Sequence, residues 1–484
     1  MYIKDRFHQF GLSDFNQPIG LKMNPENRWI KKAATIPWFA IEDRYAELFP
    51  SKTGMPAKPL RAALGSLIIQ KQYNYSDREL VEQITENPYY QYFIGLPGYQ
   101  QEQPFVPSLL VEFRKRLTEE VLADINEMII EFNKTDDQPP KGSGNTSESE
   151  DSKPEEKPAT CENEGTLILD ATCAPQHIAF PQDINLLNEA RENLEEMIDA
   201  ICDEHNEAKP RTYRKNARKD YLALAKRRKR TGKEIRKAIR KQLQYVRRDL
   251  KYINQYLEEG RELSPTHMAR LQVIQKLYEQ QKYMYDNKVH SVQDRIVSIS
   301  QPYIRPIVRG KAKAPTEFGA KLDLSVDEYG MARIEKLSFD AYNESDVLIN
   351  AIENYHNRVG RYPKRVLADK IYRNRKNLKF CKEHGIRLSG PALGRPKKDS
   401  SEDRKNTYAD AVERIEVERY FSLAKRCYGL GLIRTKLDIT TRSSICLSLI
   451  AMNVGRLTAI SLCDFLKSVF QGTFRGQLST LSLL

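Results

Sequence analysis

One long stretch without a single aromatic residue divides this sequence more firmly than any other feature. Residues 134–165 read KTDDQPPKGSGNTSESEDSKPEEKPATCENEG and contain almost nothing apolar. Such a composition cannot bury enough apolar surface to offset the loss of chain entropy, so we expect a disordered linker. The 484 residues, 40% of them hydrophobic, must then fold as at least two units, one on each side of the linker.

The segment before the linker has the periodicity of helices. Apolar residues recur at spacings of three and four in PLRAALGSLIIQKQYNYSDRELVEQI and again in FRKRLTEEVLADINEMII, which predicts an all-helical N-terminal domain over residues 1–133, and we expect this domain to bind DNA. Ser76, followed by Asp77 and Glu79, has the residue types of a helix cap. Two helices joined near Ser76 fit a DNA-reading helix-turn-helix and fit a plain helical bundle equally well.

Directly after the linker, TLILDATCAP is a short apolar and β-branched run of the kind that forms a buried strand. We expect a second unit, residues 166–484, with a mixed α/β order of elements. The expected elements after a helical insertion at about 185–290 are strands at 319–328 and 332–340 joined as a hairpin, a helix at 344–357, a strand at 365–369, a helix at 373–384, a strand in GIRLS, a helix at 408–428 and a terminal helix at 443–470.

The helical insertion is strongly basic. Between Lys209 and Lys251 there are nineteen Lys or Arg against three acids, which gives 19 − 3 = +16, more than the +13 of the whole chain. A charge run is usually a solvated helical face, but three acids cannot neutralise nineteen cations. We therefore expect contacts with phosphates, which gain affinity from counterion release, at the run Lys226, Arg227, Arg228, Lys229 and Arg230.

The composition of the whole chain favours a polyanionic partner in the cytoplasm. The pI is near 9.1, and Tyr and Phe together number 42. The seven cysteines are scattered, which fits neither a disulfide framework nor a zinc knuckle. The N-terminus has no apolar signal region, and the apolar stretch 445–460 is broken by Asn453 and Arg456, so we expect neither secretion nor a membrane span.

Three acids lie at positions where an α/β fold of this kind places ligand-binding or catalytic side chains. Asp170 lies inside the predicted strand LILDATC, and a buried carboxylate needs a partner or a metal. Asp369 ends the later strand, at the carboxyl edge where α/β sheets bind ligands. Glu418 lies on the late helix 408–428, which can pack against that edge.

Helical spacing distinguishes Glu418 from its neighbour Glu416. Arg414, Glu418 and Lys425 fall on one face of the helix, whereas Glu416 points about 200° away at 3.6 residues per turn. From the spacing alone, a carboxylate framed by two cations is more often a surface ion-pair ladder than a catalytic group.

Six short stretches of the sequence together favour a catalytic role for Glu418 over a surface ion pair. LILDATCAP, TEFGAKLDLS, SFDAYNES, VLADKIYRNRKN, SGPALGRP and RIEVERYFSLAKRCYGLGLIRTKL resemble, in order, the catalytic region of bacterial insertion-sequence DDE transposases of the InsH-like group. The family's last acid has an Arg four residues before it and a Lys seven after it, which here are Arg414, Glu418 and Lys425. The stretch from Pro56 to Leu117 also resembles the N-terminal domain of this group.

The resemblance implies a ribonuclease H-like core and a DNA transposase that cleaves insertion-sequence ends and transfers them to target DNA. It implies that Asp170, Asp369 and Glu418 are the catalytic metal ligands, and their hard oxygens suit two Mg²⁺ (or Mn²⁺) ions. The expected partners are the terminal inverted repeats and target DNA, bound by a homodimer in the bacterial cytoplasm, where the protein joins the nucleoid. Two alternatives remain: a ribonuclease H-like nuclease without strand transfer, and an inactive domesticated DNA-binding protein.

Overall fold

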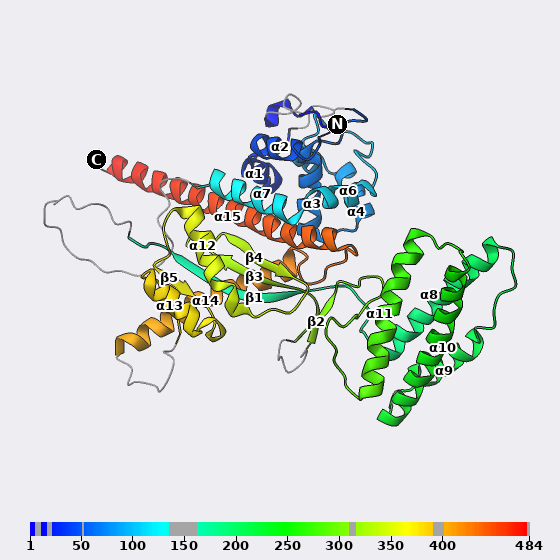
Figure 1. The fold of residues 1–484 in the computed structure, drawn as a ribbon. Helices are drawn as coiled ribbons and strands as arrows, with labels where there is room; N and C mark the ends of the chain where they lie inside the picture. Colours follow the sequence, from blue (N-terminus) through cyan, green and yellow to red (C-terminus); the bar gives the residue numbers. More distant parts are fainter. Residues whose placement is uncertain are drawn as a thin grey trace.

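The protein has three parts that differ in secondary structure: a helical N-terminal domain, a mixed sheet with its helices, and a separate helical insertion (Figure 1). The structure is a computed structural model, and it describes residues 1–4, 11–16, 22–50, 53–134, 162–308, 316–390 and 401–481, with side chains omitted at 401–404 and 461–481. Most of the linker expected at 134–165 lies outside the described residues.

The sheet has six strands and mixed directions. The strands are β1 (Thr166–Pro175), β2 (Arg305–Val308), β3 (Thr316–Val326), β4 (Ala332–Ser338), β5 (Arg365–Leu367) and β6 (Arg387–Leu388). Strand β1 is central, antiparallel to β3 on one side and parallel to β5 on the other. Strands β2 and β4 both pair with β3, and β6 closes the opposite edge, parallel to β5.

Helices cover both faces of this sheet. Helix α14 (Ser401–Cys427) packs on one face through Val417, Tyr420 and Ala424, which share a buried core with Ile168 of β1. The other face is covered by 3-10 helices η3 (Glu344–Asp346) and η4 (Lys370–Tyr372) and by helices α12 (Leu348–Val359) and α13 (Arg375–Glu383). The hairpin and the later strands and helices that the sequence predicts are all present, but α14 begins seven residues before its predicted start and α15 extends beyond both of its predicted ends.

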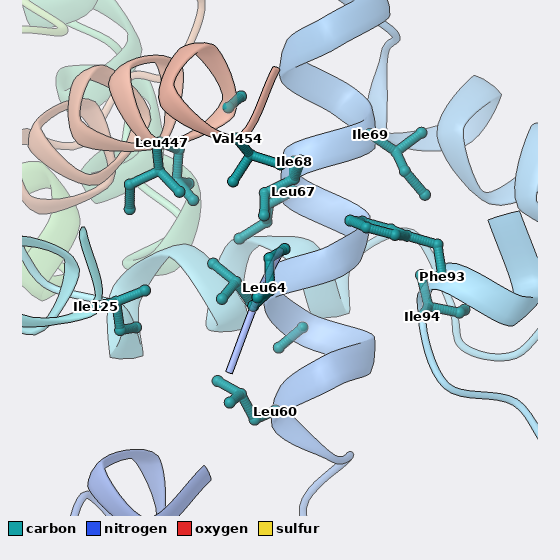
Figure 2. Packing of buried hydrophobic residues seen from close by; sticks show 14 of the residues in the cluster. Leu60, Leu64, Leu67, Ile68, Ile69, Phe93, Ile94, Ile125, Leu447 and Val454 are labelled. Carbon is teal, nitrogen blue, oxygen red and sulfur yellow. The ribbon is translucent and has the colours of Figure 1, made fainter. Parts of the chain in front are cut away.

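The N-terminal domain shares its core with the last helix of the chain. Its elements are η1 (Leu12–Asp14), α1 (Arg28–Ala34), α2 (Trp38–Ala46), α3 (Leu60–Tyr73), α4 (Asp77–Glu86), α5 (Pro88–Phe93), α6 (Leu109–Arg116) and α7 (Glu119–Phe132). Figure 2 shows Leu64 and Leu67 of α3 beside Leu447 and Val454 of α15 (Asp438–Leu481), all in one buried cluster. Helix α15 runs between the N-terminal helices and the sheet, so it joins the two parts (Figure 1).

Helix α15 is also the one described helix that is long and apolar enough to cross a membrane. Its segment Asp438–Ile460 has a hydropathy of 1.4, but 78% of the apolar 18-residue window within it is buried inside the fold. Burial against α3, α6 and α7 accounts for this apolar composition, because a helix that is apolar on most sides needs protein or lipid around it.

The insertion between β1 and β2 is a bundle with its own core. Its helices are α8 (Asp183–Glu204), α9 (Arg214–Ala225), α10 (Gly232–Glu258) and α11 (Pro265–Asn287). They stand apart from the sheet at one end of the molecule (Figure 1). The sequence predicted long helices through this region, but the chain leaves the helix at Lys226 and resumes after Thr231, whose side chain forms a capping box with Glu234.

Candidate active site

Asp170 and Asp369 lie beside each other on neighbouring strands. The parallel register ends at the pair of Ile168 and Leu367, and Asp170 and Asp369 each follow two residues later, near enough for Asp369 to raise the pKa of Asp170. Asp170 interrupts an otherwise buried run of β1, and its side chain is 18% exposed. Asp369 follows β5 as the N-cap of η4, where its carboxylate accepts a hydrogen bond from the Lys370 amide at 2.7 Å.

Burial and like charge both act on Asp170. Burial, with smaller contributions from Asp369 and Glu344, raises the pKa of Asp170 to about 6, although the Ala171 amide and Arg414 act in the opposite direction. A carboxylate that loses water and faces another carboxylate is stabilised by a cation nearby. The pair therefore has the electrostatics of a cation-binding site.

Helix α14 brings Glu418 to the same side of the sheet. The Arg414 guanidinium lies 3.5 Å from an Asp170 oxygen and 3.5 Å from a Glu418 oxygen, so one arginine joins the two acids. Glu418 is 57% exposed, whereas Glu416 forms an ion pair with Arg456 of α15 at 3.1 Å. Among the described residues, no group of three His, Cys, Asp or Glu side chains is close enough to hold a metal, and Arg414 contacts both Asp170 and Glu418.

Paired arginines fix α14 to the edge of the sheet. Arg365 of β5 forms two bonds with Glu413, at 3.0 and 2.6 Å, and Arg387 of β6 forms two with Asp410, at 2.7 and 2.6 Å. Bidentate arginine–carboxylate pairs hold orientation as well as position. They therefore set where Arg414 and Glu418 stand over the strands, and Lys425 follows Glu418 about 10 Å further along the helix at 1.5 Å per residue.

A further buried carboxylate lies on the face of the sheet opposite to Asp170, and it was not predicted from the sequence. Asp323 of β3 is fully buried and lies across from Ala171, so its side chain points to the opposite face from Asp170. It accepts hydrogen bonds from the hydroxyls of Tyr342 and Tyr372, the latter at 2.6 Å. Burial raises the pKa of Asp323 to about 6. The rule that singled out Asp170, an acid inside an apolar strand, applies equally to LDLS and would have found it.

The basic run 226–230 forms the turn between α9 and α10. Arg227 pairs with Glu234, and Arg230 donates to the Ala225 carbonyl at 2.8 Å and to Gln182 at 3.0 Å. Within the described part of the chain, Lys226, Arg228 and Lys229 are exposed and have no ion pair. The run thus lies far along the chain from the three acids, in the insertion rather than over the sheet.

The exposed surface of helix α4 is unfavourable for insertion into a DNA groove. Its exposed side chains are Arg78 and three acids, Glu79, Glu82 and Glu86, and acids are repelled by DNA phosphates. The buried side of α3 and α4 joins the core of the N-terminal domain. These features favour the helical bundle over the helix-turn-helix among the two interpretations of this region.

The fold and the site define an α/β protein whose central strands present two aspartates beneath a helix that carries a glutamate. Residues 366–455 match the family model Transposase DDE domain, and residues 20–116 match the family model Transposase domain (DUF772). In these two segments the chain is similar to the DDE transposases of insertion sequences. This family acts on DNA and uses divalent metal ions.

One curated relative is an uncharacterized protein, ORF8 in the nfe locus of Rhizobium meliloti. It is 28% identical to this chain over 117 residues, which are 24% of this chain. The matched region spans 56% of the relative's own length. No solved structure matches the chain.

Proposed function

We propose that this protein is an InsH-like transposase that cleaves DNA at insertion-sequence ends and transfers the freed ends to target DNA. The observation that carries the proposal is the placement of Asp170 and Asp369 side by side, with Glu418 joined to Asp170 through Arg414. The two matched transposase families cover the segment that contains Asp369 and Glu418 and most of the N-terminal domain.

We also propose that the sheet is a ribonuclease H-like core that carries the helical bundle as a basic insertion. The strand order β4-β3-β1-β5-β6, with three antiparallel strands followed by two parallel ones, supports this assignment. In this arrangement the first acid stands on the central strand and the second follows the neighbouring parallel strand, as Asp170 and Asp369 do. The domains would then be 1–133 and 166–484.

The residues present fit a divalent metal in their chemistry. Asp170, Asp369 and Glu418 offer hard carboxylate oxygens, and a cation would stabilise the charged form of Asp170, whose pKa is raised by burial and, to a smaller extent, by Asp369 and Glu344. These three side chains would hold Mg²⁺ or Mn²⁺, as two ions. When bound, such ions activate an attacking oxygen and stabilise a leaving oxygen at phosphorus.

The chain's own cations would then hold the substrate. Arg414 neutralises Asp170 and Glu418 in the structure, and its guanidinium is suited to a phosphate that arrives beside them. Lys425, further along α14, would hold the neighbouring backbone. Water, and later a freed 3′-hydroxyl, would attack phosphorus and lose its proton to solvent, while the 3′-oxygen of the cut strand leaves and takes up a proton from solvent to become a hydroxyl.

The partners follow from this chemistry. Joining two element ends requires two active sites, so we propose a homodimer on DNA that binds terminal inverted repeats and target DNA in the cytoplasm. The run 226–230, with Lys226, Arg228 and Lys229 exposed, would contact phosphates outside the active site.

The test is an assay with labelled duplexes that carry the sequences flanking the reading frame. We expect a cut at one fixed position that requires Mg²⁺ or Mn²⁺ and stops with a chelator, followed by joining to a plasmid. Cutting without joining would support a nuclease instead, and no metal-dependent cutting of any duplex would overturn the proposal.

A further inference from the structure

A cavity of about 520 Å³ lies where the N-terminal domain meets the end of α14. Its walls come from the turn between α3 and α4, from α6, from the loop 428–437 and from the first residues of α15. The charged residues that line it are five cations and one acid: Lys71, Arg78, Arg114, Arg434, Lys436 and Asp77.

The single acid does not balance the cations. Asp77 is already paired with Arg114, which is 6% exposed and also bonds Gln70 at 2.8 Å. The remaining three exposed cations, Arg78, Arg434 and Lys436, have no ion pair within the part of the chain that the structure describes. Cations that surround one cavity repel each other unless an anion lies between them.

Lys71 stands at the inner end of this cavity. Its ammonium donates a hydrogen bond to the Ser444 hydroxyl of α15 at 2.5 Å. Burial, and to a smaller extent Arg114, lowers the pKa of Lys71 to about 7. An ammonium has three N–H donors, and the Ser444 bond uses one of them. An anion in the cavity would therefore stabilise the charged form of Lys71 and accept its other donors.

The backbone is shaped to keep the cavity open at this place. Asn74, which ends α3, has a left-handed φ of 58°, and Gly429 faces it with a φ of 72°. A Cβ on Gly431 would lie 2.6 Å from the Lys425 carbonyl, so a glycine is required there. The loop thereby turns back over the end of α14, directly beyond the helix that carries Glu418.

The length of α14 between Glu418 and the loop that lines the cavity suits a DNA backbone. Helix α14 ends at Cys427, nine residues after Glu418, which is about 14 Å at 1.5 Å per residue. A duplex covers that length in about four base pairs at 3.4 Å each. DNA that reaches the acids along α14 would pass Lys425 and then the cavity.

We propose that this cavity binds a backbone phosphate of the DNA on which the active site acts. The inference rests on the proposed function and adds a contact that joins the N-terminal domain to the catalytic part. An acidic protein segment is a different occupant, and the experiment below separates the two. The five cations that line the cavity favour an anionic ligand over a neutral one.

The first experiment uses the variant Arg434→Gln with Lys436→Gln. Both side chains are exposed, so the fold should be kept. Its matched control is Lys376→Gln with Lys382→Gln, two exposed lysines of α13 on the opposite side of the sheet. Binding of a random-sequence duplex is titrated at several salt concentrations without metal. We expect the slope of log affinity against log salt to fall in magnitude by roughly 1.8 in the first variant, at about 0.9 per phosphate, and to stay unchanged in the control.

Equal slopes for the first variant and the parent protein would overturn the proposal, and so would an equal loss in the control. A slope that is kept while polyglutamate binding is lost would assign the cavity to an acidic protein segment instead. As a second measurement, the duplex should protect Lys436 from acetic anhydride but not Lys376, and equal modification of Lys436 with and without DNA would contradict the inference.

The two proposals can fail separately. If the parent protein shows the predicted slopes but never cuts DNA with Mg²⁺, the proposed function is wrong and the phosphate site stands. If it cuts and joins DNA while the first variant keeps the full slope, the phosphate site is wrong and the function stands.

Discussion

Asp170 and Asp323 lie on opposite faces of the central strands and have different surroundings. Asp170 points toward α14 and Arg414, whereas Asp323 is buried on the other face with Tyr342 and Tyr372. Tyr372 ends the 3-10 helix η4, whose N-cap is Asp369. The Asp323–Tyr372 hydrogen bond thus fixes the short segment that holds Asp369, and we infer that Tyr372 is a positioning residue.

Removing that hydroxyl tests this inference. Tyr372→Phe should lower the cleavage rate about 10-fold to 100-fold at low Mg²⁺, the usual range for a lost partner behind a metal ligand. Part of the rate should return at high Mg²⁺, with DNA binding unchanged. The control is Tyr362→Phe, since the Tyr362 hydroxyl contacts only Glu353 at 3.4 Å among its described partners. A full rate for Tyr372→Phe at low Mg²⁺ would show that Asp369 needs no such support.

A buried acid in the insertion makes its stability depend on pH. Asp249 is fully buried in α10, and neither carboxylate oxygen has a hydrogen-bond partner among the described residues. Burial, with a smaller effect of Glu195, raises the pKa of Asp249 to about 8. Between its usual pKa near 4 and about 8, the folded state binds more protons than the unfolded state, so stability falls as pH rises.

We therefore expect the melting temperature of the insertion, followed by circular dichroism, to fall between pH 5 and pH 8. The slope has an upper limit of about 1.4 kcal/mol per pH unit. Asp249→Asn should flatten this dependence and raise stability at pH 8. The same pH dependence in the parent and the variant would show that another group is responsible.

At the scale of elements, helix α14 and the turn 226–230 carry the proposed DNA contacts. The sequence placed α14 correctly, because its apolar residues recur at helical spacing, but it could not place Arg414 against Asp170. That contact depends on how α14 packs across the strands, which Arg365 and Arg387 determine from distant positions in the chain. Glu418 was chosen over Glu416 by helical phase and by resemblance, and the Glu416–Arg456 ion pair supports that choice.

A separate prediction concerns the turn 226–230 and the salt dependence of DNA binding. Replacement of Lys226, Arg228 and Lys229 by Gln should lower the magnitude of the log-affinity versus log-salt slope by roughly 0.9 for each phosphate that the protein no longer neutralises, on any DNA sequence. Arg230→Gln serves as the contrast, because Arg230 holds the turn itself through Ala225. An unchanged slope in the triple variant would mean that the run is a solvated surface, and weaker binding to element ends alone would give the insertion a role in sequence reading.

At the scale of the whole molecule, the last helix, α15, packs against the N-terminal domain. The sequence predicted a terminal helix, which the structure contains as α15, and helices before the linker, which it contains as α1 to α7. Their shared core was not predictable, because Leu67 and Leu447 are 380 positions apart and periodicity shows only that each helix has an apolar face. The strand order was likewise beyond the sequence pattern, since it depends on which edges of the strands pair.

Tryptophan fluorescence can test whether α15 stabilises the N-terminal domain, because both tryptophans, Trp29 and Trp38, lie in that domain. Leu447→Ala on α15 should lower the free energy of unfolding seen by this probe by about 2–5 kcal/mol, the cost of a buried leucine. The control Leu271→Ala, buried in the core of the insertion, should leave the tryptophan transition unchanged. A transition unaffected by Leu447→Ala would show that α15 does not stabilise the N-terminal domain.

The central claim is that Asp170, Asp369 and Glu418 form one catalytic site, and Glu418 is its most distant member. The most direct test compares Glu418→Gln with Glu416→Gln in single-turnover cleavage of a labelled element end with Mg²⁺. The account predicts that Glu418→Gln abolishes cleavage while DNA binding and thermal stability are kept, and that Glu416→Gln retains cleavage although its ion pair with Arg456 is removed. Full cleavage by Glu418→Gln, with no cleavage by Glu416→Gln, would contradict it.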